Sequence, residues 1–216
     1  WNVYELFDFN IAYEIRLHDA LEERMLAPFH YIGVSDYEQN GSVIEEKSPI
    51  NELVTPERVD HIVETLNYYG YEGDMLRGII FCSRVVEAET LARELTARGI
   101  RARSVSGQQS EEERAEAIRQ LECGDIEYII SVDVFNEGVD IPTLNQIVML
   151  RATESSIVFI QQLGRGLRKA PGKRYVTVID FIGNYQSNFL SPIALSGDRS
   201  MNKDTIRRAV TDVRFL

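Results

Sequence analysis

The sequence is poor in the residues that build metal centres and disulfide frameworks. Its 216 residues include only two cysteines, Cys82 and Cys123, and three histidines, His18, His30 and His61. The cysteines form no CxxC pair, and neither lies near a histidine at the spacing of a zinc site. We therefore expect no metal site and two buried, reduced thiols.

Long apolar runs are also missing. No segment approaches the ~18 consecutive apolar residues that cross a bilayer, and no basic-then-apolar signal segment opens the chain. With 44% hydrophobic and 26% charged residues, the composition is typical of a globular domain. We expect a cytoplasmic protein with no membrane partner.

Two phosphate-binding patterns are absent as well. The chain contains neither a GxxxxGK[ST] loop nor an Asp-Glu pair at the end of a strand. It also lacks the glycine-rich fingerprint after a first strand that a dinucleotide or nucleotide-sugar enzyme would need. These absences argue against a self-contained nucleotide-binding enzyme.

Charge is distributed unevenly along the chain. The net charge is −11, yet residues 151–216 hold 11 Lys and Arg against 5 Asp and Glu. The acidic total therefore conceals a basic C-terminal part. Such an asymmetry permits a local phosphate-binding surface on an acidic body, although charge runs are more often solvated faces.

Short apolar runs alternate with amphipathic segments from residue 55 onward. Helices of about a dozen residues between consecutive strands argue for βαβ units. We predict an α/β fold with a parallel sheet and helices on both faces, in which ligands bind at the carboxyl ends of the strands. The predicted strands are Phe29–Val34, Arg77–Cys82, Ile100–Val105, Ile126–Val132, Gln146–Leu150 and Tyr175–Ile179.

Three helix starts carry capping residues. Thr55 precedes a proline at the first helical position, Ser83 follows a strand, and Ser110 with Glu113 forms a capping box. Gly70 and Gly99 are placed to end the first two helices. The positions predicted to face inward are Val86, Leu91, Ala92 and Leu95 in the second helix and Ala115, Ile118 and Leu121 in the third.

The segment Ser155–Arg168 combines an apolar face with a polar one. At about 100° per residue, Gln161, Arg165 and Arg168 lie within about 60° of one another on the polar side of a helix. Two arginines one turn apart suit a transferring phosphoryl group, since a guanidinium stays charged and offers a planar fork of donors. Two surface arginines in weak ion pairs would explain the pattern equally well.

Four segments, in order along the chain, resemble motifs of superfamily two helicases. Ile79–Arg84 is similar to motif IV and Ser106–Arg114 to the accessory motif after it. Asp133–Pro142, which reads DVFNEGVDIP, resembles motif V, and Gln161–Arg168, which reads QQLGRGLR, resembles motif VI. The likeness extends over residues 77–185 and is closest to bacterial DEAD/DEAH-type helicases related to restriction-enzyme motor subunits.

This resemblance implies a RecA-like fold, the C-terminal lobe of a P-loop NTPase helicase. Arg168 and Arg165 would reach the γ-phosphate of ATP across a cleft between two lobes, with Arg168 as the better candidate for the arginine finger. The remaining nucleotide-binding residues would be Gln161, Gly138 and Asp140. Asp140 could instead be a simple junction between a strand and a turn.

The same resemblance implies contacts to a nucleic-acid backbone, with DNA favoured over RNA. Asn136 is included because Val132 has no hydroxyl where several relatives place a threonine. Phosphate contacts carry no sequence information, so binding should be sequence-tolerant and weakened by salt. Ser83 could equally serve as a helix cap and Gly107 as a turn residue. The implied contact residues are Ser83, Arg84, Gly107, Gln108 and Asn136.

We expect residues 1–50 to be the tail of a first lobe and the interlobe linker, residues 51–185 the RecA-like lobe, and residues 186–216 the start of a following region. Trp1 in place of an initiator methionine suggests a piece of a longer protein. The predicted function is the motor lobe of an ATP-dependent helicase or translocase. ATP with Mg²⁺ would be held mainly by the missing N-terminal lobe, and the piece alone would be inactive. A RecA-like binding or interaction module without chemistry is the alternative.

Overall fold

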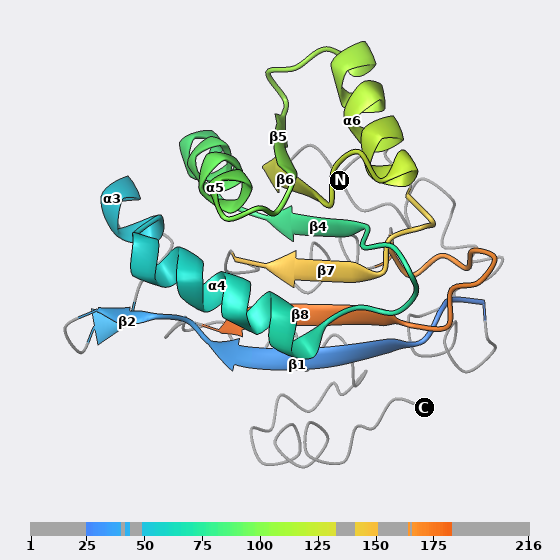
Figure 1. Ribbon diagram of the computed structural model, residues 1–216, viewed down its shortest axis with the longest axis horizontal. Coiled ribbons are helices and arrows are strands. Elements are labelled where there is room, and N and C mark those ends of the chain that lie inside the picture. The colour runs from blue at the N-terminus through green and yellow to red at the C-terminus, as the bar shows by residue number, and fades with distance from the viewer. Residues whose placement is uncertain are drawn as a thin grey trace, which may run out of the picture.

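A sheet of six parallel strands forms the centre of the molecule (Figure 1). The computed structural model describes residues 25–39, 42–43, 49–132, 141–150, 164 and 166–182. The strand order is β1-β8-β7-β4-β6-β5, which confirms the predicted parallel α/β fold. The strands are β1 (Phe29–Ser35), β4 (Gly78–Phe81), β5 (Ala102–Ser106), β6 (Tyr128–Val132), β7 (Gln146–Met149) and β8 (Val176–Ile182).

The N-terminal strand joins the sheet at its edge. β1 pairs in parallel with β8 over its whole length, from Phe29 opposite Val176 to Ser35 opposite Ile182. A small antiparallel ribbon of β2 (Glu38–Gln39) and β3 (Ser42–Val43) follows it. β1 lies within the predicted segment 1–50 and pairs with β8, a strand of the predicted lobe 51–185.

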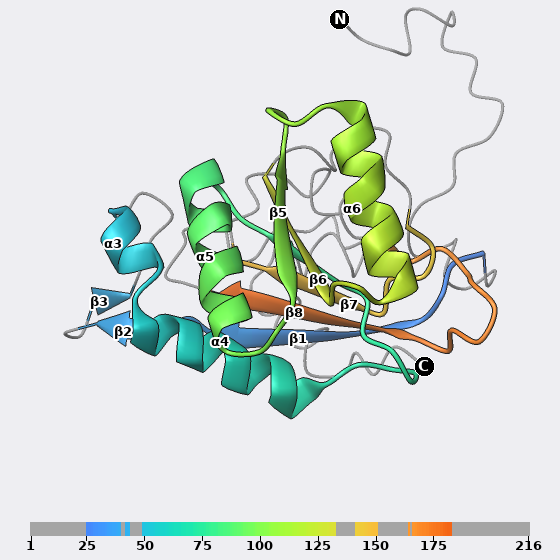
Figure 2. The same cartoon turned by 45° about the horizontal axis from the view of Figure 1, so that its top comes forward.

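Helices cover both faces of the sheet, as predicted. On one face, α4 (Pro56–Tyr69) and α5 (Val85–Ala97) bury side chains such as Ile62 and Leu91 against Ile80 of β4. On the other face, α6 (Glu111–Cys123) buries Leu121 against Phe81. Figure 2 shows β5 between α5 and α6. Successive side chains of β4 point to opposite faces of the sheet. Because both faces are buried under helices, the whole strand is apolar.

Helix ends follow the predicted capping chemistry in two of three cases. The Thr55 side chain accepts a hydrogen bond from the Arg58 N–H at 3.2 Å, and Gly70 ends α4 with φ of 61°. Ser110 and Glu113 form the reciprocal capping box of α6. A short helix, α3 (Ile50–Leu53), precedes α4.

Four expectations about individual residues were wrong. Ser83 is not the cap of α5, because the helix starts one residue later, with Arg84 at the N-cap position. Val86 is 55% exposed and Ala115 is exposed. Each of these two lies two residues, about 200°, from a buried helical position and so points away from the sheet. Cys82 is buried as expected, whereas Cys123 is exposed at the end of α6.

No helix in the described part of the chain is both long and apolar enough to span a membrane.

Candidate functional site

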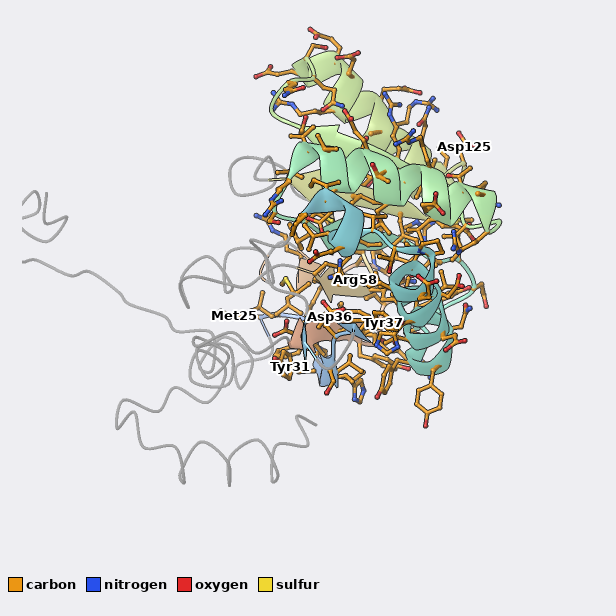
Figure 3. The ribbon with its side chains drawn as sticks, turned by 90° about the vertical axis from the view of Figure 1, so that its left-hand side faces the viewer. Met25, Tyr31, Asp36, Tyr37, Arg58 and Asp125 are labelled. Atoms are coloured by element: carbon orange, nitrogen blue, oxygen red, sulfur yellow. The ribbon has the colours of Figure 1, made fainter. Side chains whose placement is uncertain are left out.

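The carboxyl ends of β4 and β5 carry the described candidates for nucleic-acid contact. Ser83 and Arg84 follow β4, while Gly107 and Gln108 follow β5. β6 lies between these two strands. In a parallel sheet all three ends meet at one edge, so the structure brings the two loops to the same side of the molecule. Figure 3 looks onto this edge, toward which the arrowheads point in Figure 1.

The loop after β4 is held from inside by Glu87 of α5. The Ser83 N–H and hydroxyl both donate to Oε2 of Glu87, at 3.2 and 3.1 Å. Ser83 and Arg84 are half-buried, whereas Glu87 is 1% exposed. The Glu87 carboxylate, in the third residue of α5, therefore holds Ser83 in place, while the helix has no side-chain cap.

Glu87 belongs to a buried charged cluster at the same edge of the sheet. The Arg58 Nε and Nη2 donate to the Asp36 carboxylate at 2.9 and 2.6 Å, and Nη1 donates to the Leu53 carbonyl. Nη1 also lies 3.6 Å from Oε1 of Glu87. Figure 3 shows Arg58 of α4 beside Asp36, which directly follows β1. The guanidinium is therefore shared between carboxylates from two different segments.

Burial and pairing shift the ionisation of this cluster. Burial raises the pKa of the Glu87 carboxyl, although the Arg58 charge and the Ser83 hydrogen bonds act in the opposite direction. Burial lowers the pKa of Arg58, but its hydrogen bond to Asp36 and the charges of Asp36 and Glu87 outweigh this effect, so the pKa lies above its usual value. Arg58 therefore remains a cation within the core.

The loop after β5 is shaped by its own side chains. Oε1 of Gln109 accepts hydrogen bonds from the Ser106 N–H at 2.5 Å and from the Ser106 hydroxyl at 3.1 Å. The Gln108 N–H lies 3.4 Å from the same hydroxyl oxygen. Gly107 and Gln108 are exposed beyond this anchor, which leaves their backbone facing solvent at the carboxyl edge.

Arg168 lies at the opposite end of the sheet. Its carbonyl accepts a hydrogen bond from Lys173 Nζ at 3.0 Å, and the same nitrogen donates to the carbonyls of Pro142, at 2.8 Å, and Gly166. The neighbouring Leu167 carbonyl accepts from the Ala27 N–H at 2.6 Å. These contacts come from Ala27, Pro142 and Lys173, which precede β1, β7 and β8. Arg168 therefore lies near the amino ends of these strands, and it is exposed.

Arg168 therefore does not lie at the carboxyl ends of the strands, where a parallel sheet was expected to bind its ligands. The chain must return from the carboxyl end of β7 to the amino end of β8, because these neighbouring strands are parallel. Gly164 and Gly166 have helical backbone, and the helix ends before Leu167. A Cβ on Gly166 would lie 2.6 Å from Cδ1 of Ile147, so this segment packs closely on β7.

Five candidates lie outside the described residues: Gln161, Arg165, Gly138, Asp140 and Asn136. Their segments start directly after β6 and β7. Val132, the last residue of β6, is 6% exposed. Among the residues that the structure describes, no group of three or more His, Cys, Asp or Glu side chains could hold a metal ion.

Comparison with known proteins identifies the family. Residues 57–170, just over half of the chain, match the helicase conserved C-terminal domain. The chain belongs to this helicase family. A Saccharomyces cerevisiae protein assigned as the ATP-dependent helicase IRC3 is 26% identical over 170 residues, 78% of this chain. The ATP-dependent RNA helicase SrmB of Haemophilus influenzae is 26% identical over 134 residues, 62% of this chain.

Solved structures show the same fold for this helicase domain. The C-terminal domain of the DEAD-box protein Dbp5 matches with a TM-score of 0.57 and 16% identity, over 87% of this chain and 99% of that chain. A fragment assigned as an HsdR subunit of a type I restriction enzyme from Vibrio vulnificus matches with a TM-score of 0.63 and 18% identity, over 89% and 39%. The predicted RecA-like helicase lobe is thus confirmed.

The helicase domain spans only part of its curated relatives. It covers 25% of the yeast protein and 30% of the Haemophilus protein. Both relatives carry ATP-dependent helicase names.

Sequence reasoning missed four residues that organise the site: Asp36, Arg58, Glu87 and Lys173. None of the four lies inside a segment that resembles a helicase motif. One signal was available for Arg58. It lies next to the apolar Val59 in the first turn of the helix that begins at Pro56, on the side that is buried in α4. No signal in the sequence pairs Lys173 with Pro142, because 31 residues separate them.

Proposed function

We propose that this helicase domain is the second motor lobe of an ATP-dependent nucleic-acid helicase or translocase. One surface, near Arg168, completes the ATP site of a first lobe. The other, at the carboxyl edge of the sheet, forms part of a track for a nucleic-acid backbone. The observation that carries the proposal is that the family-matched fold presents Arg168 and the Ser83 and Gly107 loops at opposite ends of one sheet.

Arg168, together with Arg165, acts on the γ-phosphate. Phosphoryl transfer depends on positioning and charge stabilisation, for which a guanidinium is well suited. The exposure of Arg168 supports this role, as does the fixing of its backbone by Lys173. Closure of the two lobes would bring the arginine to the nucleotide, and opening would release it.

ATP with Mg²⁺ supplies the phosphoryl group and the metal charge. Since the 216 residues include no GxxxxGK[ST] sequence, the first lobe holds the phosphates and the metal. Gln161, Gly138 and Asp140 face the same nucleotide in this proposal. The chain by itself should therefore hydrolyse ATP at no more than background rate.

Ser83, Arg84, Gly107 and Gln108, with Asn136, follow the nucleic-acid backbone. The loop of Ser83 and Arg84 and the loop of Gly107 and Gln108 share the carboxyl edge of the sheet, which supports a continuous track. We favour DNA over RNA because the segments that resemble motifs V and VI are similar to those of bacterial DEAD/DEAH-type helicases related to restriction-enzyme motor subunits. A structural relative in that group, the restriction-modification enzyme LlaBIII, was solved bound to DNA and has 24% identity and a TM-score of 0.55.

Oligonucleotide binding tests the track directly. The 216-residue chain is titrated with a fluorescein-labelled single-stranded DNA, and with the RNA of the same sequence, at several salt concentrations. We expect Arg84→Ala to weaken binding equally across sequences and to reduce the salt slope by about 1. Arg93→Ala, which removes the same charge from the exposed side of α5, is the control. Equal affinities for wild type and Arg84→Ala would refute the track.

A further inference from the structure

Four side chains from three segments meet beneath the loop that follows β4. We call Asp36, Arg58, Ser83 and Glu87 the Arg58 cluster. Its charged side chains are 0 to 1% exposed. Asp36 follows β1, Arg58 lies in the first turn of α4, and Glu87 lies in the first turn of α5. The cluster therefore connects the edge strand to the start of both helices on this face.

Stability alone is a weak explanation for these buried charges. Removing charged groups from water costs free energy that their attraction repays only in part, and apolar side chains of similar volume often serve stability equally well. A hydrogen-bonded ionic cluster can instead fix the orientation of the side chains within it. Asp36 is bound by two nitrogens of Arg58, and Glu87 by two donors of Ser83, so each carboxylate has a fixed orientation.

We propose that Arg58 and Glu87 are positioning residues for the nucleic-acid contact at Ser83 and Arg84. Glu87 fixes the loop through the Ser83 N–H and hydroxyl, and Arg58 anchors Glu87 to Asp36 at the end of β1. This inference rests on the proposed function and deepens it, because it assigns the residues that set the shape of the track.

Ser83 and Arg84 have different roles within the loop. Both donors of Ser83 point inward to Glu87, so Ser83 orients the loop and Arg84 meets the phosphate. Arg84 is the N-cap of α5, and the backbone N–H groups of the first turn follow it. Such groups favour an anion at a helix N-terminus. The loss of affinity should therefore be larger for Arg84→Ala than for Ser83→Ala.

Binding of the 216-residue chain to a labelled 20-nucleotide DNA strand tests the positioning role. Glu87→Ala should raise the Kd by roughly 2- to 10-fold, the value of a lost hydrogen bond or two. A pure charge effect has the opposite sign, because removing an acidic group should tighten binding to a polyanion. Glu89→Ala, on the exposed side of the same helix, reports that charge effect. Glu87→Gln keeps an acceptor for Ser83 but loses the charge, so its affinity should match that of Glu89→Ala and not fall below that of wild type.

A double-mutant cycle separates positioning from general loss of structure. If Glu87 acts through Ser83, then Glu87→Ala should cost less in a Ser83→Ala background than in wild type, because only the hydrogen bond from the backbone N–H of residue 83 is left to lose. Thermal unfolding identifies the variants that fold. Should Glu87→Ala not fold, Arg58→Lys replaces it: lysine keeps the charge but not the two-point contact with Asp36, and the Kd should rise in the same direction.

The outcomes are distinguishable. If the wild-type chain does not bind, or if Arg84→Ala binds as wild type does, the proposed function fails and the inference fails with it. If Arg84→Ala weakens binding while Glu87→Ala matches Glu89→Ala and Arg58→Lys matches wild type, only the positioning role is overturned. Independent, additive losses from Ser83→Ala and Glu87→Ala would also overturn it.

Discussion

At the scale of single residues, Gly78, the first residue of β4, and Gly107, which follows β5, differ in the space around them. A Cβ on Gly78 would lie 2.2 Å from a ring carbon of Tyr128, whose hydroxyl donates to Gln146 in the core. A Cβ on Gly107 would meet no atom within 4 Å. Gly107 also does not have the positive φ seen at Gly70. Neither packing nor φ requires glycine at 107, which leaves close approach of a ligand as the reason that fits the proposed track.

Alanine at these two positions should therefore give opposite results. Gly78→Ala should lower the free energy of unfolding by about 1–3 kcal/mol, because the Tyr128 ring must move within a packed core. Gly107→Ala should change it by less than about 0.5 kcal/mol and weaken oligonucleotide binding instead. Urea unfolding and binding titrations measure both. A stable Gly78→Ala variant would contradict the packing argument.

Glu87 predicts a pH dependence of stability. Its pKa is raised in the folded state by burial, and the charge of Arg58 and the hydrogen bonds from Ser83 act in the opposite direction. The folded protein then holds this proton at pH values where the unfolded chain has released it, so its contribution is fully present below the unfolded pKa, near 4.5, and is lost as the pH rises through the folded pKa.

Unfolding experiments at several pH values measure this effect. Glu87→Gln has no such proton and should lose less stability than wild type over the same rise from pH 4.5. Glu89→Gln, on the exposed side of α5, is the matched control. Parallel pH profiles for wild type and Glu87→Gln would show that the Glu87 carboxyl does not titrate in this window.

At the scale of elements, local chemistry was easier to predict than the direction of a helix face. Caps depend on neighbours in sequence, so Thr55 and the Ser110–Glu113 box were predicted from spacing alone. The inward face depends on where the helix meets the sheet. Val86 and Ala115 were assigned inward because they are apolar, yet the helix rotation set by Leu91 and Leu121 turns them outward.

Lys173 links three elements at the amino end of the sheet. Its Nζ donates to the carbonyls of Pro142, Gly166 and Arg168, as a cation often does at a helix C-terminus. We expect Lys173→Met to lower the free energy of unfolding by about 1–3 kcal/mol, because charged hydrogen bonds are lost and the half-buried carbonyls are left without a donor.

Urea unfolding of Lys173→Met and of Lys169→Met compares two lysines of the same loop. Lys169 is exposed, and its substitution should change stability by less than about 0.5 kcal/mol. Equal effects at both positions would mean that the three carbonyl contacts contribute no stability.

At the scale of the whole molecule, most of the fold followed from the sequence. Alternating strands and helices predicted the parallel sheet, because βαβ units leave few other arrangements. The position of β1 beside β8 did not follow, since pairing across 147 positions, from Phe29 to Val176, leaves no local signal. The charged cluster escaped prediction for the same reason: Asp36, Arg58 and Glu87 are distant in sequence and meet only in the fold.

The central claim is that this lobe completes an ATP site begun by another lobe. The most direct test is steady-state ATP hydrolysis by the longer protein that carries both lobes, at saturating nucleic acid, for wild type, Arg168→Ala and the neighbouring control Lys169→Ala. The account predicts that Arg168→Ala lowers turnover by ~10³-fold or more, with a smaller change in ATP affinity, while Lys169→Ala stays near wild type. Unchanged turnover in Arg168→Ala would contradict it.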